Sequence, residues 1–477
     1  MNKKLTYQSN GFFDEYITNN SSPRKGFKRS IGFFNSLTGS QKIYFKKLCE
    51  SSISSMGVTF QLNADELKDR LWPLDLIPRI ISLNKWEIVE CGLSQRVKAL
   101  NLFINDVYNK QEFLNKNPVL KDLILDSPNF LSECMGISPK NKVWSNICGT
   151  DLIRNHNGDF FVLEDNLRVP SGVAYMLENR NIMKRVIPEL FNSYEVNPVD
   201  DYPSQLYQCL CDASFSTNQK KTIVVLTPGV FNSAYFEHSY LAQQMGVELV
   251  EASDLYVSRS GNVLMKTING PKKIDVIYRR VDDIYLDPKT WLKNSTLGIP
   301  GIYKSWKSKK IAIVNAPGSG VADDKAVYAY VPKMIKFFLN ERPIISQVKT
   351  YVCAIKKDLD YVVNNIDQLV LKPVNESGGY GILIGPQASK SELKEYKLKI
   401  MNNPRNFVAQ PLIRLSTAPT LIGKNIVPRH LDLRPFILSG KKSFVTKGGL
   451  TRVAMKKGST IVNSSQGGGS KDTWIAD

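Results

Sequence analysis

The stretch that most constrains the fold is residues 369–384, where a β-branched run ends in a lysine, passes through a glycine-rich turn and resumes as a second apolar run. Two strands joined in this way predict a β-hairpin, and glycine in the turn lets the backbone approach oxygens that a Cβ would block. The N–H groups of such a turn can close over phosphates while Lys372 neutralises them. A Walker A loop is excluded, because it needs G-x-x-x-x-G-K-[ST] ahead of a helix. An ordinary glycine-rich hairpin at a sheet edge explains the same residues, so both interpretations stay open.

A second group of polar residues surrounds a turn sequence, His-Asn-Gly-Asp at 156–159, that lies between two short strand-like runs. Because side chains alternate along a strand, Glu164 and Asn166 share one face, and the partner strand can bring Asp151 alongside. Two carboxylates and an amide oxygen are hard ligands that suit Mg²⁺. Arg168 shares the same face and could hold a transferring phosphate or a carboxylate. A solvated acidic hairpin face is the competing interpretation.

The strand that carries these ligands leads into a predicted helix that begins near Tyr175. Ser171 and Gly172 lie at its N-terminus, where backbone donors and the helix dipole favour an anion. We therefore expect these two residues to bind a substrate carboxylate or a phosphate. A plain Ser/Gly N-cap accounts for them without any ligand.

Two later segments suit a nucleotide. At 315–325 a strand ends in a glycine-rich loop ahead of a helix, and Lys325 comes early in that helix as a second phosphate contact. At 408–413 an extended segment with a proline break, which contains Gln410 and Leu412, is suited to offering backbone groups to an adenine edge. A lysine on a helix surface and an interdomain linker are the respective alternatives.

The remaining pattern predicts several domains of the α/β and α+β classes. Residues 1–140 are mainly helical, with apolar residues at three-to-four spacing near 93–104. Between 201 and 300, strands alternate with a helix at 235–245 that Gly246 ends, so we expect a small parallel sheet. Its first turn lacks G-x-G-x-x-G, which argues against a dinucleotide fold. From 301 the chain is strand-rich again, with helices expected at 324–339 and near 391–401.

The net charge of +19 makes nucleic acid the obvious partner to consider. The lysines are spread along the 477 residues, however, and no basic run of five or more residues and no helix-turn-helix, zinc-finger or RNP pattern is present. Nucleic-acid binding is therefore not expected as the main function. A positive field would equally draw in a nucleotide triphosphate and a carboxylate substrate.

Neither a membrane span nor a secretion signal is expected, because no window approaches 18 uninterrupted apolar residues and the first residues are polar. Seven scattered cysteines fit buried free thiols in a reducing cytoplasm. The three histidines are isolated and no G-x-S-x-G occurs, so the sequence offers no nucleophile and base pair.

Taken together, the lysine strand, the glycine hairpin, the extended segment and the Glu-x-Asn strand resemble the ATP-grasp ligases. In most of that superfamily the lysine and glycine loop precede the metal residues, whereas here the metal strand comes about 200 residues earlier. That order resembles the circularly permuted ATP-grasp proteins, which are related to glutathionylspermidine synthetase. The similarity covers roughly residues 150–475 and includes the blocks at 164–172, 278–283, 371–381, 429–435 and 463–472.

The resemblance implies an ATP-grasp fold in circularly permuted order, with ATP and Mg²⁺ as cofactors. The regions implied are a helical N-terminal region at 1–140, a metal-binding part at 141–200, a small substrate domain at 201–300 and a nucleotide-binding part at 301–477. The ATP contacts implied are Lys325, Lys372, Glu376, Ser377, Gly378, Gly379, Gly381, Gln410 and Leu412. The magnesium ligands implied are Asp151, Glu164 and Asn166. Arg168 and Arg280 are the expected catalytic residues, and Ser171, Gly172 and Asp282 the expected substrate contacts.

The activity implied is ligation of a carboxylate to an amine through an acyl-phosphate, with a small molecule or peptide on each side. Glutathionylspermidine synthetase has a threonine-containing turn after its Glu-x-Asn, where this chain has Leu167-Arg168-Val169. The chain also lacks a matching amidase domain, so glutathione and spermidine do not follow as substrates. A nucleotide-binding pseudo-enzyme or regulatory protein of the same fold is the alternative.

Overall fold

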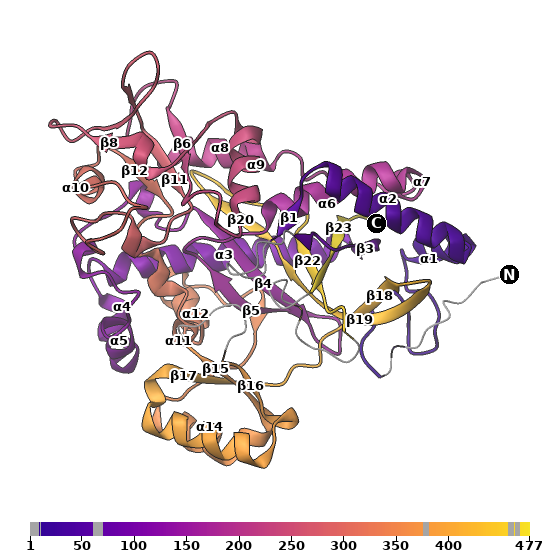
Figure 1. The fold of residues 1–477 in the computed structure, drawn as a ribbon. Helices are drawn as coiled ribbons and strands as arrows, with labels where there is room; N and C mark the ends of the chain where they lie inside the picture. Colours follow the sequence, from indigo (N-terminus) through magenta and orange to yellow (C-terminus); the bar gives the residue numbers. More distant parts are fainter. Residues whose placement is uncertain (1–8, 10, 61–69, 375–380, 457–461, 463–467) are drawn as a thin grey trace.

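The structure, a computed structural model, describes residues 9, 11–60, 70–374, 381–456, 462 and 468–477. The predicted phosphate-loop residues Glu376, Ser377, Gly378 and Gly379 lie outside the described residues. Figure 1 shows a large central sheet, a small α/β unit at its upper left, and a second small unit that projects below it. Apart from that loop, these three parts contain the sequence segments expected to form the site.

The central sheet joins segments from both ends of the chain. Its main path runs β13–β5–β4–β19–β22–β23–β3, with β18 paired to β19 and β20 paired to both β4 and β21. The strands are β3 (Leu74–Ile81), β4 (Ile147–Arg154), β5 (Phe160–Asn166), β13 (Ser346–Gln347), β18 (Thr417–Ile422), β19 (Asn425–Arg434), β20 (Phe436–Ser439), β21 (Ser443–Val445), β22 (Leu450–Val453) and β23 (Gly469–Ile475). The expected hairpin is confirmed, since β4 and β5 are antiparallel with Asp151 opposite Glu164.

Helices cover both faces of this sheet. The long helix α3 (Leu83–Val107) contacts β20 and β21, and α6 (Val173–Val186) contacts β22 and β23. Along β20, Ile437 packs in the core cluster that contains α3, whereas Phe436 and Leu438 pack in the cluster that contains α6. Alternate residues of a strand point to opposite faces, so α3 and α6 lie on opposite sides of the sheet.

The small α/β unit contains the parallel sheet expected between 201 and 300. Its order is β12–β11–β6–β7, and every neighbouring pair is parallel. The strands are β6 (Ile223–Leu226), β7 (Glu248–Val250), β11 (Val276–Arg279) and β12 (Ala312–Val314), with helices α8 (Tyr202–Ala213), α9 (Tyr235–Met245) and α10 (Ile302–Lys307). An antiparallel ribbon of β8 (Leu255–Val257), β9 (Val263–Met265) and β10 (Lys272–Lys273) is attached. Helix α9 ends at Gly246 with φ of 65°, as its sequence predicted.

One strand of the small parallel sheet comes from beyond residue 300, where the sequence predicted a domain boundary. Strand β12 pairs with β11 and completes the small parallel sheet, so this sheet extends beyond the 201–300 segment. The residues after it, which were expected to form one helix over 324–339, instead form α11 (Lys325–Tyr328), α12 (Val331–Met334) and a wider turn at Ile335–Leu339. Pro332 lies in the first turn of α12, where its missing N–H is tolerated at a helix start but not in a helix interior.

The lower unit is an antiparallel sheet backed by helices. Its order is β14–β17–β15–β16, with strands β14 (Tyr351–Val352), β15 (Leu369–Pro373), β16 (Leu383–Ile384) and β17 (Phe407–Pro411). Helices α13 (Lys356–Asn364) and α14 (Lys390–Asn402) belong to it, and α14 lies below the strands in Figure 1. Strands β15 and β16 pair antiparallel, as expected for the lysine hairpin.

The N-terminal region is helical except where it joins the central sheet. Its helices are α1 (Lys28–Ser36), α2 (Gly39–Ser55), α4 (Glu112–Asn115) and α5 (Pro118–Leu125), besides α3, and α7 (Pro188–Asn192) contacts α1. A short pair, β1 (Thr59–Phe60) and β2 (Arg70–Leu71), precedes β3, which runs parallel to β23. The strand β3 was not expected in this region.

Candidate active site

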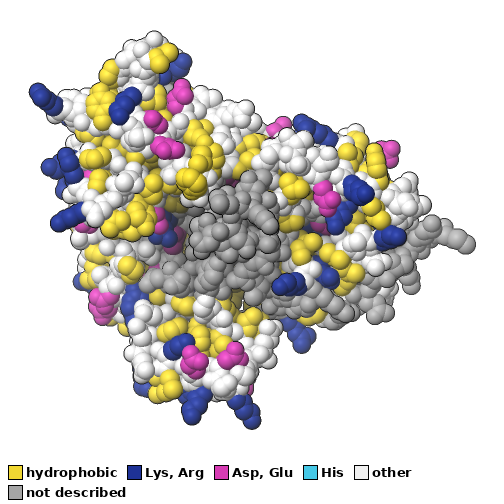
Figure 2. All heavy atoms as spheres, in the orientation of Figure 1, with side chains coloured by type: hydrophobic (Ala, Val, Ile, Leu, Met, Phe, Trp, Pro, Cys, Tyr) yellow, Lys and Arg dark blue, Asp and Glu magenta, His cyan; other side chains and the backbone are white. Residues whose placement is uncertain are grey.

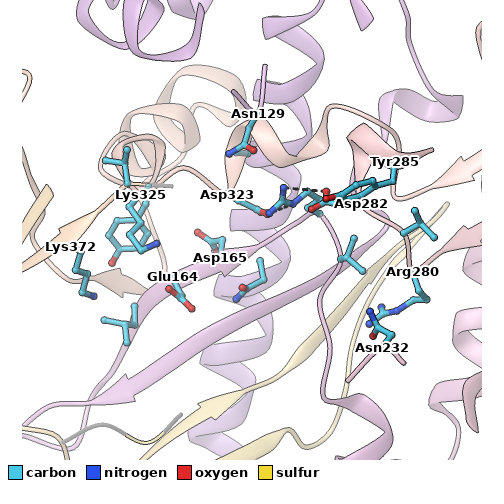
Figure 3. A pocket seen from close by; sticks show the side chains of 18 of the residues that line it. Asn129, Glu164, Asp165, Asn232, Arg280, Asp282, Tyr285, Asp323, Lys325 and Lys372 are labelled. Atoms are coloured by element: carbon cyan, nitrogen blue, oxygen red, sulfur yellow. Dashed lines mark ion pairs between the residues drawn. The ribbon is translucent and has the colours of Figure 1, made fainter. Parts of the chain in front are cut away.

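A cavity of about 460 Å³ lies where the three parts meet. Its walls come from β5 and the turn after it, the ends of β6 and β11, the α11 segment, and strands β15 and β17. The sequence-predicted residues that line it are Glu164, Asn166, Arg168, Arg280, Asp282, Lys325, Lys372 and Gln410. Figure 3 places Lys325 and Lys372 at one end, Arg280 and Asn232 at the other, and Glu164 between them.

The lysine end of the cavity carries positive charge at partly buried positions. Lys372 Nζ donates to Gln410 Oε1 at 2.6 Å, and Gln410 Nε2 donates to Thr350 Oγ1 at 2.8 Å. Strand pairing explains the first contact, because Val370 lies opposite Gln410 and Lys372 is two residues further along β15. Burial, and also the charge of Lys325, lowers the pKa of Lys372 to about 8. A polyanion bound here would restore the charged form of this lysine.

Residues of β5 line the cavity without strict alternation, since Leu163 and Asp165 line it as well as Glu164 and Asn166, and the β4–β5 register shifts between Asp151 and Leu152. Glu164 and Asn166 line the cavity, and Asn166 Nδ2 donates to Gly149 O at 3.1 Å, which leaves the amide oxygen as its acceptor. Between them, Asp165 forms a buried ion pair with Arg96 of α3 at 2.7 Å. The middle residue of the Glu-Asp-Asn run is thus held by α3.

Asp151 lies beside Glu164 but is not part of the cavity lining. It accepts from Arg434 Nη2 at 2.8 Å and from Arg452 Nη2 at 2.7 Å, and Arg452 also pairs with Asp432. Burial alone would raise the pKa of Asp151, yet the two guanidinium groups hold it below its usual range. Burial and the neighbouring Asp151 charge raise the pKa of Glu164.

These residues fit a divalent cation by their donor chemistry. The described part of the chain contains no group of three or more His, Cys, Asp or Glu side chains placed to hold a metal ion. The predicted magnesium ligands are not such a group, because they comprise only two carboxylates, those of Asp151 and Glu164, together with the amide oxygen of Asn166. Asp151 is buried and both of its oxygens accept from arginines, whereas Glu164 is partly exposed to the cavity, so Glu164 and the Asn166 oxygen are the donors best placed to meet a hard cation.

The opposite wall is acidic around one arginine. Arg168 lies 3.2 Å from Asp282 and 3.7 Å from Asp323, measured between guanidinium nitrogen and carboxylate oxygen, as the dashed lines in Figure 3 mark. Close packing holds it, because a Cβ on Gly320 would lie 2.8 Å from Arg168 Cδ. The nearby Asp283 pairs with Arg279 at 2.6 Å.

The expected anion site at the start of α6 is filled by the protein itself. Gly172 N and Ala174 N donate to Glu237 Oε2 at 2.7 Å and 3.1 Å, and Glu237 Oε1 lies 3.1 Å from Arg280. Arg280 also donates to Ser171 Oγ at 2.5 Å. The expectation that Gly172 offers its N–H to a substrate is therefore corrected, because the buried carboxylate of Glu237 from α9 takes it; the Ser171 hydroxyl oxygen accepts from Arg280.

Two further predicted residues lie away from the cavity lining. Leu412 follows the end of β17 and is partly buried elsewhere. Gly381 has φ of 67°, a backbone conformation that favours glycine, and the Tyr396 hydroxyl donates to its carbonyl. Its glycine identity thus has a conformational reason.

The cavity also contains polar residues that the sequence did not single out, namely Asn129, Asp165, Asn232, Tyr285, Asp323 and Tyr328. Asp165 and Asp323 lie within the predicted metal strand and the predicted lysine loop. No sequence pattern pointed to the other residues. Glu237 likewise has no local signal, because its partners lie 63 or more residues before it and 43 residues after it.

Comparison with known proteins places the fold in context. Residues 78–454 match the protein family described as circularly permuted ATP-grasp type 2. An uncharacterized protein from Synechocystis sp. is 47% identical over 472 residues, covering 98% of each chain, and one from Mycobacterium tuberculosis is 49% identical over 420 residues, covering 88% of this chain and 76% of that one.

Two other relatives carry descriptive names. A Frankia casuarinae protein named as a candidate glutamate–cysteine ligase is 40% identical over 429 residues, which are 89% of this chain and 49% of that protein, so the chain spans about half of its length. A solved structure of a glutathione synthetase-like effector from Globodera pallida superimposes with a TM-score of 0.61 at 11% identity, covering 92% of this chain and 98% of that one. At that identity the likeness concerns the fold alone.

Two broader properties bear on partners. In the described ranges, no helix combines the length and apolar character needed to cross a bilayer. On the face drawn in Figure 2, lysine and arginine side chains lie in separate groups over several parts of the molecule. The described residues that are visible on this face thus form no single basic patch of the kind that nucleic-acid binding favours.

Proposed function

The chain belongs to the circularly permuted ATP-grasp type 2 family, and on that premise we propose that it is an ATP-dependent ligase that joins a carboxylate to an amine. The observation that carries the proposal is the meeting of three distant segments in one cavity. Lys325 and Lys372 stand at one end of the cavity in Figure 3 with Glu164 between them and Arg280, and Asn166 and Arg168 line the same cavity. The volume of about 460 Å³ falls within the range of roughly 300–1,000 Å³ that is usual for small-molecule sites.

The lysine end is the proposed place for the ATP phosphates. Lys325 and Lys372 offset the charge of the transferring phosphoryl group, and Gln410 orients the Lys372 ammonium. Gly381 and the glycine-rich segment before it would cover the phosphates. Leu412, which follows β17, stays a proposed contact through its backbone groups with the adenine edge.

The proposed cation site is the β4–β5 pair. Glu164 and Asn166 would hold Mg²⁺ from the cavity side, with Asp151 next to Glu164 across the strands. Such an ion, when bound, supplies positive charge to the β- and γ-phosphates and orients them. Arg434 and Arg452 keep Asp151 ionised but hold both of its oxygens, so the direct ligands of the cation would come first from Glu164 and Asn166.

The chemistry proposed takes two steps. A substrate carboxylate, held by donors of Arg168, attacks the γ-phosphorus, so that a C–O–P linkage forms, the bond to ADP breaks and an acyl-phosphate results. An amine then attacks the acyl carbon, a C–N bond forms and phosphate leaves. We assign Asp282, which pairs with Arg168, to binding of the amine. Arg280, which donates to Pro170 O, would hold the wall of the cavity in place. The substrates proposed are small molecules or peptides, with no role for nucleic acid or a membrane.

The relatives support this proposal in general terms. The Frankia protein is named for glutamate–cysteine ligation, which also forms an amide from a carboxylate and an amine. The acid and amine used by the present chain are not fixed by that name. The reaction type is therefore the proposal, and the substrates are to be found by screening.

The test is ADP and phosphate release from Mg-ATP in the presence of pools of amino acids, dicarboxylic acids, small peptides and polyamines. We expect one or more pools to stimulate release in the native protein and none to do so in Glu164→Ala. Tight ATP binding without release under any pool would favour a nucleotide-binding pseudo-enzyme. Absence of ATP binding would overturn the proposal.

A further inference from the structure

We propose that Asp323 is the catalytic base of the second step, and that with Asp282 it binds the acceptor as a protonated primary amine. This inference rests on the proposed ligase function and names both a residue and a substrate class for it. The acceptor is then a compound with a primary ammonium group that reaches the cavity from the acidic end. Neither carboxyl group belongs to the predicted ATP or magnesium contacts.

The position of Asp323 links the two ends of the cavity. It lies two residues before Lys325, so one short segment presents both the proposed phosphate lysine and this carboxylate to the same space. In Figure 3 Asp323 stands between Lys325 and Asp282. An acyl-phosphate held by the lysine would therefore have Asp323 on the side from which an amine arrives.

One oxygen of Asp323 is held in place and the other is open to a further donor. Oδ1 accepts from the backbone N–H of Leu167 at 2.7 Å, which fixes the carboxylate against the turn after β5. Oδ2 lies 3.7 Å from Arg168 Nε, which is beyond hydrogen-bond distance. An ammonium in the cavity can thus approach Oδ2 without displacing a hydrogen bond.

The charges around this wall favour a cation. Arg168 is shared between Asp282 and Asp323, while Arg279 is already paired with Asp283. The cavity wall therefore presents two carboxylates to one guanidinium, and a bound ammonium completes the pairing. Because a guanidinium has five N–H donors, Arg168 keeps donors for the substrate carboxylate, which brings the two reacting groups next to each other.

The acidity of Asp323 suits a base that works near neutral pH. Burial raises the pKa of Asp323 to about 7, because lost hydration disfavours the carboxylate more than Arg168 stabilises it, and Asp283 and Asp282 add to the shift. A base with a pKa near the working pH transfers protons most effectively. The ionisable or charged groups on elements around it are Arg168, Arg279, Asp282, Asp283, Tyr108, Cys134 and Arg405, those across the cavity are Glu164, Asp165, Tyr285 and Lys372, and those on its own segment and the helix after it are Asp324, Lys325 and Tyr328.

The protons balance as follows. Asp323 takes one proton from the ammonium and becomes neutral, and the uncharged nitrogen attacks the acyl carbon. As the C–N bond forms, the C–O bond to phosphate breaks and its electron pair leaves with the phosphate oxygen. The second nitrogen proton goes to that phosphate, and Asp323 returns its proton to solvent before the next turnover.

The test separates the two chemical steps with hydroxylamine, which is largely uncharged at neutral pH and attacks acyl-phosphates without a base. Hydroxamates formed from Mg-ATP and a pool of amino acids and dicarboxylic acids report the first step. Amides formed from the same pool, measured by mass spectrometry, report both steps. Asp323→Asn, which keeps the shape of the side chain, is compared with Asp367→Asn, a change at an exposed carboxyl on the lower unit.

We expect Asp323→Asn to form hydroxamate within about threefold of the native rate while amide formation falls by about 10²–10⁴-fold. The native rate of amide formation should fall as the pH drops below about 7. Asp323→Asn should not show this decrease, and a purely structural role of Asp323 would not change the shape of the pH–rate profile in this way. Native amide rates in Asp323→Asn, or equal losses in both assays, would overturn the role of Asp323. Absence of hydroxamate in the native protein would instead overturn the ligase proposal and this inference with it.

Discussion

Replacing Lys372 with methionine tests the lysine end of the cavity through its charge. The side chain donates to Gln410 at 2.6 Å, and its pKa is lowered to about 8 by burial and by Lys325. The charged form is the one that binds phosphate, so ATP affinity should be full below pH 8 and lost as the pH rises through 8. Lys372→Met keeps the length of the side chain and removes the charge.

The magnitudes follow from the charge and the pKa. A hydrogen bond to a charged group contributes about 1.5–3 kcal/mol, so Lys372→Met should weaken ATP binding by about 10- to 150-fold at pH 7. With a pKa of about 8 in the free protein, the native affinity should itself weaken about tenfold between pH 7 and pH 9, since the lysine must regain its proton on binding. The variant should lack this dependence.

Isothermal titration calorimetry with Mg-ATP at pH 7, 8 and 9 measures both effects. Lys356→Met is the matched control, because Lys356 is exposed and pairs only across the helix surface with Asp360. It should bind ATP as the native protein does at every pH. Equal affinities for the native protein and Lys372→Met, with parallel pH profiles, would refute the assignment of this lysine to the phosphates.

Three further changes probe the surroundings. Burial raises the pKa of Glu15, but Arg79 and Arg154 outweigh that effect and lower the pKa to about 2. The charged form therefore contributes on the order of 3 kcal/mol to folding stability above pH 4.5, and this contribution is lost as the pH falls toward 2. Glu15→Gln should flatten the acid unfolding curve followed by circular dichroism. Arg96→Met leaves Asp165 charged and buried, and should cost about 3–5 kcal/mol in urea unfolding, much of it recovered when Asp165 is also replaced by Asn. Gly320→Ala puts a Cβ 2.8 Å from Arg168, and should lower turnover while ATP affinity stays native by calorimetry.

The parts of the site that the sequence predicted are those with a short-range rule behind them. Strand alternation grouped Glu164 with Asn166, and both line the cavity, while glycine at 246 ended α9 as expected. The β15–β16 pairing followed from the apolar runs on either side of the glycines. Each of these inferences needed only neighbours in the chain.

The parts that were missed depend on partners far apart in the chain. The Glu237 carboxylate accepts from N–H groups at the start of α6, 63 or more residues away in the chain, and no periodic sequence pattern predicts such a contact. The pairing of β12 with β11 likewise depends on which sheet a short apolar run joins, which its three residues do not encode. The sequence predicted no role for Asp323 beyond its place in the 315–325 loop, because the cavity forms only where β5 and β11 meet that loop.

The central claim is that a substrate carboxylate, not water, attacks ATP. The most direct measurement is transfer of ¹⁸O from a pool of carboxyl-labelled amino and dicarboxylic acids to the phosphate released in ordinary water. One labelled oxygen is expected in each phosphate formed with ADP, as an acyl-phosphate that loses its phosphate to an amine requires. Release of unlabelled phosphate would contradict it, because water would then be the attacking group and the protein an ATPase rather than a ligase.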